Sequence, residues 1–106
     1  MSNMIHLAAS KYQIEAFCLK WKIAELSLFG SVLRDDFRPG SDLDVLVSFD
    51  PAARWSLMTM VDMQLELEKI VGRKVDLVER NAVEQSENYI RRQHILASAE
   101  PFYVAR

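Results

Sequence analysis

The sequence predicts an α/β (α+β) fold with one small mixed β-sheet flanked by helices. Helical and strand-like patterns follow one another in the order helix, strand, strand, helix, strand, helix. Half of the 106 residues are apolar, which is enough material for a core. Since no internal repeat or linker interrupts the chain, residues 1–106 are predicted to form a single domain.

A first helix is predicted over residues 8–22. Apolar residues recur there at the spacing of one helical face, at Ile14, Phe17, Cys18 and Trp21. A short strand over 25–29 follows and stops at Gly30. The turn sequence at 39–41 then precedes the most strand-like stretch of the chain, over 42–49.

The longest helical pattern covers residues 55–71 and is expected to end at Gly72. Its core stripe consists of Met60, Met63, Leu67, Ile70 and Val71. Further apolar residues widen the coverage beyond that stripe, at Leu57, Met58, Val61 and Leu65. This excess fits either a deep core position or a surface for a partner protein.

The rest of the chain is predicted to hold a strand over 75–78 and a helix over 86–99 that Pro101 ends. Residues 102–104 form a short extended end. His94 on the last helix is expected to be a surface or half-buried residue and not a catalyst.

Composition excludes several classes of protein. Thirteen basic and fifteen acidic residues give a formal charge of −2, which argues against a broad phosphate-binding face, so direct nucleic-acid binding is not expected. The single cysteine, Cys18, excludes an internal disulfide, suits a reducing compartment and is expected in the core. Without a secretory segment or a long apolar run, the protein is expected in the cytoplasm and not in a membrane.

The residues that carry chemistry are Gly30 and Ser31, followed after ten intervening residues by Asp42 and Asp44. Strand alternation places the two aspartates on the same side of their strand. Because paired carboxylates repel each other, a divalent cation such as Mg²⁺ is their natural partner. Asp76 interrupts the third strand in a similar way, so the three carboxylates converge if the two strands are neighbours.

A phosphate group could lie at the start of this motif. Gly30 allows close backbone approach, Ser31 adds a hydroxyl, and Arg34 stands about one turn further on. Such a cradle facing metal-bound carboxylates is suited to displacement at phosphorus. The simpler alternatives are that Ser31 only caps a helix and that Arg34 only balances its acidic neighbours. Likewise, Asp42, Asp44 and Asp76 could be solvated acids on exposed strands.

The pattern Gly30-Ser31-x₁₀-Asp42-x-Asp44 resembles the signature of the DNA polymerase β-like nucleotidyltransferase superfamily. The small size and the later Asp76 match its minimal nucleotidyltransferase (MNT) branch. The similarity covers a motif core of about residues 26–79, and more loosely the flanking helices at about 8–22 and 86–99. It implies the polymerase β-like nucleotidyltransferase fold.

The resemblance also implies a catalytic and metal-binding set, Asp42, Asp44 and Asp76. It implies a nucleotide-binding set, Gly30, Ser31 and Arg34. In active relatives the third carboxylate can act as a general base on the acceptor hydroxyl. The implied cofactor is Mg²⁺ in a two-metal site, with Mn²⁺ suiting the same ligands, and the implied substrate is ATP. One departure is Val32, which stands where many MNT proteins have a second basic residue.

MNT proteins are similar in function to one another: many are antitoxins that act on a HEPN-domain toxin, typically a ribonuclease. They transfer AMP from ATP to a tyrosine hydroxyl of the toxin and release pyrophosphate. The resemblance implies this activity here, in a hetero-oligomeric complex, since the chain is expected to lack an acceptor site of its own. The alternatives are an antitoxin that neutralises its partner by binding alone, and nucleotidyl transfer to a small-molecule hydroxyl.

Overall fold

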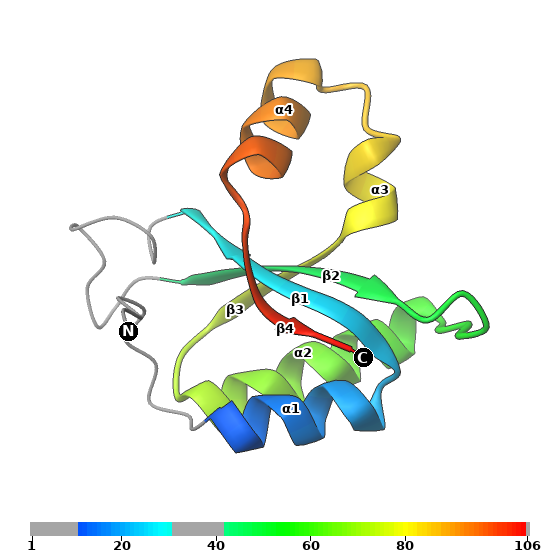
Figure 1. Cartoon of the computed structure of the whole chain (residues 1–106), viewed down its shortest axis with the longest axis vertical. Coiled ribbons are helices and arrows are strands. Elements are labelled where there is room, and N and C mark those ends of the chain that lie inside the picture. Colours follow the sequence, from blue (N-terminus) through cyan, green and yellow to red (C-terminus); the bar gives the residue numbers. More distant parts are fainter. Residues whose placement is uncertain (1–10, 31–41, 106) are drawn as a thin grey trace.

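A four-stranded mixed sheet lies at the centre of the computed structural model, which describes residues 11–30 and 42–105 (Figure 1). The strands are β1 (Ile23–Phe29), β2 (Leu43–Phe49), β3 (Val75–Glu79) and β4 (Glu100–Val104). They lie in the order β3-β2-β1-β4. β1 runs antiparallel to both β2 and β4, whereas β2 and β3 are parallel. The predicted mixed sheet is therefore confirmed.

Helices lie on both faces of this sheet. They are α1 (Lys11–Lys20), α2 (Leu57–Val71), α3 (Arg80–Glu84) and α4 (Tyr89–Ser98). α1 and α2 cover one face side by side, and the α3–α4 pair stands on the other (Figure 1). α2 connects β2 to β3, because parallel neighbours need a long crossover. No helix in the described ranges is long and apolar enough to cross a membrane.

The boundaries of α2 follow from its caps. The Ser56 side chain accepts a hydrogen bond from the Thr59 N–H at 3.1 Å, which satisfies one of the free donors of the first turn. Gly72 ends the helix as predicted, in a left-handed conformation with φ +76°, and its N–H donates to the Glu68 carbonyl at 2.9 Å. The helix therefore begins two residues later than the predicted 55 and ends where expected.

The main core lies between the sheet and the α1–α2 layer. In β2 the side chains of Leu43, Val45 and Val47 are buried there, as the alternation predicts. The α1 residues Ile14, Phe17 and Cys18 pack on the same cluster. A second, smaller cluster on the opposite face joins the sheet to α3 and α4 through Phe29, Leu46, Val83 and Ile95.

The excess apolar residues of α2 are divided between core and surface. Met63, Leu67 and Val71 are buried, and Met60 and Ile70 pack beside them, which confirms the predicted stripe. The other apolar side chains of the helix are exposed: Leu57, Met58, Val61 and Leu65. The prediction that these four side chains lie deep in the core is therefore wrong. The alternative, a surface for a partner protein, stays a prediction.

Three predicted boundaries change in the second half of the chain. A short helix, α3, precedes α4, and α4 begins at Tyr89 because the Asn88 side chain accepts from the Arg91 N–H at 3.1 Å and caps it there. α4 ends at Ser98, so Pro101 does not end it but lies within β4, an edge strand, where its missing N–H is tolerated. The extended end is therefore a fourth strand, paired with β1.

The edge strand β3 is held by side chains of α2. The Val75 N–H donates to Glu68 Oε2 at 3.0 Å, and the Leu77 N–H donates to Gln64 Oε1 at 3.3 Å. These two acceptors, four residues apart on the helix, occupy backbone donors that an edge strand would otherwise present to solvent. α2 therefore fixes the position of β3 from the side as well as from the core.

Replacing the carboxylate that binds β3 tests this arrangement. We expect Glu68→Ala to lower the free energy of unfolding by about 1–2 kcal/mol, because it leaves a half-buried N–H without its acceptor. Glu66→Ala is the matched control on the same helix: it loses only the exposed 2.8 Å ion pair to Lys20, worth about 0.5 kcal/mol or less. Urea denaturation measures both. Equal losses in the two variants would contradict the role of Glu68.

Cys18 provides a second test of the core. Burial, and to a lesser extent the Glu15 carboxylate, raises the pKa of the Cys18 thiol from 9.0 to about 12. Because the folded-state pKa lies above the unfolded one, this contribution to stability is complete below pH 9.0 and is lost progressively up to about pH 12. At pH 8 we expect a disulfide reagent to label Cys18 rapidly in urea and only very slowly in buffer. Rapid labelling of the folded protein would contradict its burial.

Candidate active site

Asp44 and Asp76 occupy neighbouring positions on the two parallel strands. The register pairs Leu43 with Val75, Asp44 with Asp76 and Val45 with Leu77. Paired residues of parallel strands point to the same face. Since the flanking apolar residues belong to the core under α1 and α2, both aspartates face the other side, where α3 and α4 stand. The condition of the prediction is therefore met, since the two strands are neighbours and Asp44 stands beside Asp76. Convergence of all three carboxylates stays a prediction.

Asp42 lies immediately before β2. The residue is exposed, as is Asp76, whereas Asp44 is half-buried. The strand begins at Leu43, so the prediction that Asp42 shares a strand face with Asp44 does not describe its position. Three acids thus lie near the amino ends of β2 and β3, with Asp44 in the most enclosed place.

Gly30 follows the last residue of β1 and lies beside this group. Phe29 pairs with Asp44 across the antiparallel β1–β2 ladder, so Gly30 is the next residue along. Its φ of +78° is one that glycine adopts readily and other residues rarely. Ser31, Val32 and Arg34, the other members of the predicted phosphate-binding segment, lie outside the described residues.

The donor set fits a hard cation that is also bound by a substrate. No group of three or more His, Cys, Asp or Glu residues placed to hold a metal ion occurs within the described ranges. Carboxylate pairs are nevertheless the usual protein ligands of Mg²⁺, which commonly takes its other ligands from waters and substrate phosphates. Asp44 and Asp76, paired on one face, supply such a pair.

Sequence reasoning did not find the residues that hold this pair in register. Gln64 and Glu68 fix β3, and therefore Asp76, through backbone hydrogen bonds. Their spacing of four residues on a predicted helix places them on one side of it. That spacing identifies a polar stripe, but the strand beside it depends on the tertiary fold.

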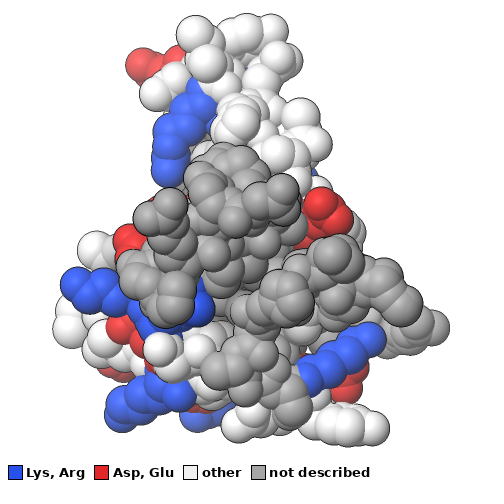
Figure 2. All heavy atoms as spheres, turned by 90° about the vertical axis from the view of Figure 1, so that its left-hand side faces the viewer, with Lys and Arg blue, Asp and Glu red and all other residues white. Residues whose placement is uncertain are grey.

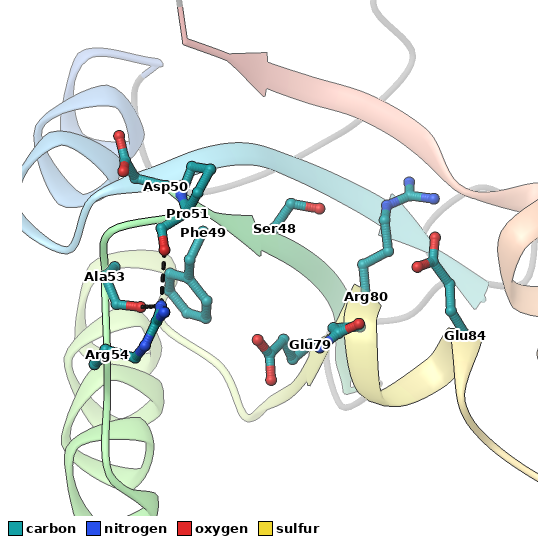
Figure 3. A pocket seen from close by; sticks show the side chains of 10 residues that line it. Ser48, Phe49, Asp50, Pro51, Ala53, Arg54, Glu79, Arg80 and Glu84 are labelled. Carbon is teal, nitrogen blue, oxygen red and sulfur yellow. Dashed lines mark hydrogen bonds between the residues drawn. The ribbon is translucent and has the colours of Figure 1, made fainter.

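A depression of about 320 Å³ lies at the other end of the same strands (Figure 3). Its charged residues are of both signs: Asp50, Arg54, Glu79, Arg80 and Glu84. The Arg54 guanidinium already donates to the backbone carbonyls of Pro51 and Ala53, at 2.7 and 3.1 Å. Because neither Asp44 nor Asp76 lines this depression, it is separate from the carboxylate pair.

Figure 2 shows the side of the molecule on which β1 ends and β2 begins. Over the part of this face that the structure describes, Lys and Arg side chains alternate with Asp and Glu and do not gather into one stripe. Both signs of charge are therefore visible on the described part of this face.

Known proteins share both sequence and fold with this chain. The family model described as a nucleotidyltransferase domain matches residues 10–97. The chain is 34% identical over 73 residues to MJ0435 of Methanocaldococcus jannaschii, described as a "putative protein adenylyltransferase". It is 31% identical over 64 residues to the protein adenylyltransferase MntA of Thermococcus cleftensis. These matches cover 69% and 60% of this chain, and 76% and 63% of the two relatives.

Solved structures extend the likeness to the fold. A structure described as a "putative minimal nucleotidyltransferase" superimposes with a TM-score of 0.65 at 28% identity, covering 86% of this chain and 87% of that one. A toxin–antitoxin structure with AMP-PNP gives a TM-score of 0.69 at 17% identity, covering 92% and 75%. A structure of a tri-AMPylated Shewanella oneidensis HEPN toxin in complex with an MNT antitoxin gives a TM-score of 0.61 at 18% identity. The match covers 90% of this chain and 70% of the matched one. The last two likenesses show the fold.

Divalent metal binding at the carboxylates can be measured through stability. At about ten times its Kd, a ligand stabilises the folded state by about 1.4 kcal/mol, which raises the Tm of a domain of this size by about 6–10 °C. We expect Mg²⁺ to raise the Tm of the wild type, and to raise it much less in Asp44→Asn and Asp76→Asn. Asp62→Asn, which changes an exposed carboxylate of α2, is the control and should keep the shift. A shift that persists in both site variants would place the metal elsewhere.

Proposed function

The chain belongs to the nucleotidyltransferase domain family, and from this premise we propose that it transfers AMP from ATP to a hydroxyl of a partner protein. The partner we propose is a HEPN-domain toxin, the acceptor a tyrosine of that toxin, and the second product pyrophosphate. The protein would then act as the antitoxin of a toxin–antitoxin pair. A cytoplasmic location, where ATP and Mg²⁺ are available, accompanies this proposal.

The observation that carries the proposal is the pairing of Asp44 with Asp76 beside Gly30. A solvated acid on an exposed strand needs no partner acid at the paired position of the next strand. Two carboxylates on one face, with a glycine close to one of them, Asp44, suit a nucleotide with its bound cation. The relatives support the finer proposal, because two carry the name protein adenylyltransferase and one fold neighbour is an antitoxin bound to an AMPylated HEPN toxin.

In the proposed reaction the acceptor hydroxyl attacks the α-phosphorus of ATP. A bond forms between the acceptor oxygen and that phosphorus, and the bond from the phosphorus to the oxygen that bridges to the β-phosphate breaks. Pyrophosphate leaves with the electron pair. We assign Asp76 to accept the hydroxyl proton, because it is exposed and so can reach an acceptor from outside the chain. Asp44 is half-buried, so it is better placed to hold a cation than to accept the proton of an incoming hydroxyl.

Asp42, Asp44 and Asp76 are the residues we propose to hold Mg²⁺. Bound there, the cation would neutralise charge on the phosphate oxygens and orient the triphosphate. Gly30, together with Ser31 and Arg34, is proposed to lie against the phosphates. The alternative for Ser31, a helix cap, is compatible with this role, because a capped helix start also presents free N–H groups.

Isotope placement in ATP tests the reaction. The protein is purified in complex with the product of its neighbouring gene and incubated with Mg²⁺ and ATP labelled at either the α- or the γ-phosphate. We expect the partner to acquire label from the α position only, because AMP transfer leaves the other two phosphates in pyrophosphate. Asp44→Asn should reduce the rate by at least about a hundredfold, in line with the loss of a group that stabilises transition-state charge. Asp62→Asn is the control and should leave the rate unchanged.

The other two functions predict different results in the same assay. A stable complex that takes label from neither position would show an antitoxin that neutralises by binding alone. Label that appears on an added small hydroxyl compound, and not on the partner, would show small-molecule nucleotidyl transfer. Label from the γ position would contradict AMP transfer and indicate a kinase.

A further inference from the structure

Gly30 lies directly against the carboxylate of Asp44. A Cβ atom built onto Gly30 would overlap Oδ2 of Asp44, and would stand 3.1 Å from its Cγ and 3.4 Å from its Cβ. Apart from the chain neighbours of Gly30, these are the three nearest atoms among the described residues, and all belong to the same side chain. Any other residue at position 30 therefore requires the Asp44 carboxylate to move.

We propose that Gly30 is a positioning residue for Asp44: the missing side chain at position 30 provides the space that the Asp44 carboxylate occupies. This role is distinct from the contact with nucleotide phosphates considered for Gly30 above. The importance of the carboxylate for metal binding rests on the proposed function, whereas the contact itself does not.

The strand register explains why the two residues meet. Phe29 pairs with Asp44 across the β1–β2 ladder, and Gly30 is the next residue as the chain leaves β1. Since β2 lies between β1 and β3, Asp44 has Gly30 toward one neighbouring strand and Asp76 toward the other. A side chain on residue 30 would therefore disturb the position of Asp44 relative to Asp76.

The chain contains its own control for backbone strain. Gly30 has φ +78°, so any substitution there is strained whatever space surrounds it. Gly72, at the end of α2, has φ +76°, yet a Cβ built onto it meets no atom of the other described residues within 4 Å. Gly72→Ala therefore incurs the strain of the left-handed backbone alone, and Gly30→Ala incurs that strain together with the contact to Asp44.

Urea unfolding of the full chain in metal-free buffer separates the two effects. Each glycine variant is made in three backgrounds: wild type, Asp44→Ala and Asp44→Asn. In the wild-type background we expect Gly30→Ala to raise the unfolding equilibrium constant about tenfold more than Gly72→Ala does, the usual cost of overpacking. This excess should disappear with Asp44→Ala, which removes the overlapping atoms, and persist with Asp44→Asn, which keeps their shape without the charge.

The positioning role has a second readout in metal affinity. Mn²⁺ binding is followed by electron paramagnetic resonance without nucleotide. We expect Gly30→Ala to weaken the affinity at least about tenfold, a coupling of about 1.4 kcal/mol, and Gly72→Ala to leave it unchanged. Equal affinities in the two glycine variants would overturn the positioning role.

The other possible outcomes also support or overturn the proposed role of Gly30. An equal stability cost for the two glycine variants, or an excess that survives Asp44→Ala, would overturn the inference. If Gly30→Ala alone does not fold, recovery of folding by Asp44→Ala but not by Asp44→Asn supports it, and failure of both overturns it. If the wild type binds no Mn²⁺, the proposed metal role of Asp44 fails, and the stability measurements still decide whether Gly30 makes room for its carboxylate.

Discussion

The parallel pairing of β2 with β3 is the constraint on which the candidate site depends. Its register places Asp44 beside Asp76 on one face and Leu43 beside Val75 in the core on the other. A slip of one residue would bury a carboxylate under α1 and α2 and turn a core side chain out to solvent. The hydrophobic core therefore enforces the register that the chemistry needs, although none of its side chains belongs to the site.

The helix α2 connects the core, the sheet edge and the site. It supplies the crossover that parallel strands require, and its buried stripe packs on the sheet. On one side of that stripe, Gln64 and Glu68 accept hydrogen bonds from β3. Edge strands are the elements of a sheet most able to slip or to pair with other chains. The position of Asp76 thus depends on polar side chains of a helix on the opposite face of the sheet.

Local patterns predicted much of this arrangement, and the remainder depends on contacts distant in sequence. The alternation of polar and apolar residues predicted that Asp44 and Leu43 point to opposite faces of the sheet. The preference of glycine for the left-handed conformation predicted that α2 ends at Gly72. No local pattern shows that β2 and β3 are neighbours, so the meeting of Asp44 with Asp76 could only be predicted conditionally. The sequence does not predict α3, because five residues are too few to show a helical period. It predicts the extended end at 102–104 but not its place in the sheet, because the partner strand β1 lies some seventy residues earlier. Roles for Ser31 and Arg34, outside the described residues, remain predictions from the resemblance.

The candidate site and the exposed apolar residues of α2 lie on opposite sides of the sheet. The carboxylates lie on the face that carries α3 and α4, which pack around Leu46 further along the strand. The exposed apolar residues of α2, such as Met58 at 72% exposure, lie on the outer side of the other layer. If the chain transfers AMP as proposed, the acceptor hydroxyl would reach Asp76 on the α3–α4 face, because the core fills the space on the opposite face. In the proposed transfer, the acceptor would therefore reach the face of the sheet opposite to the exposed apolar residues of α2.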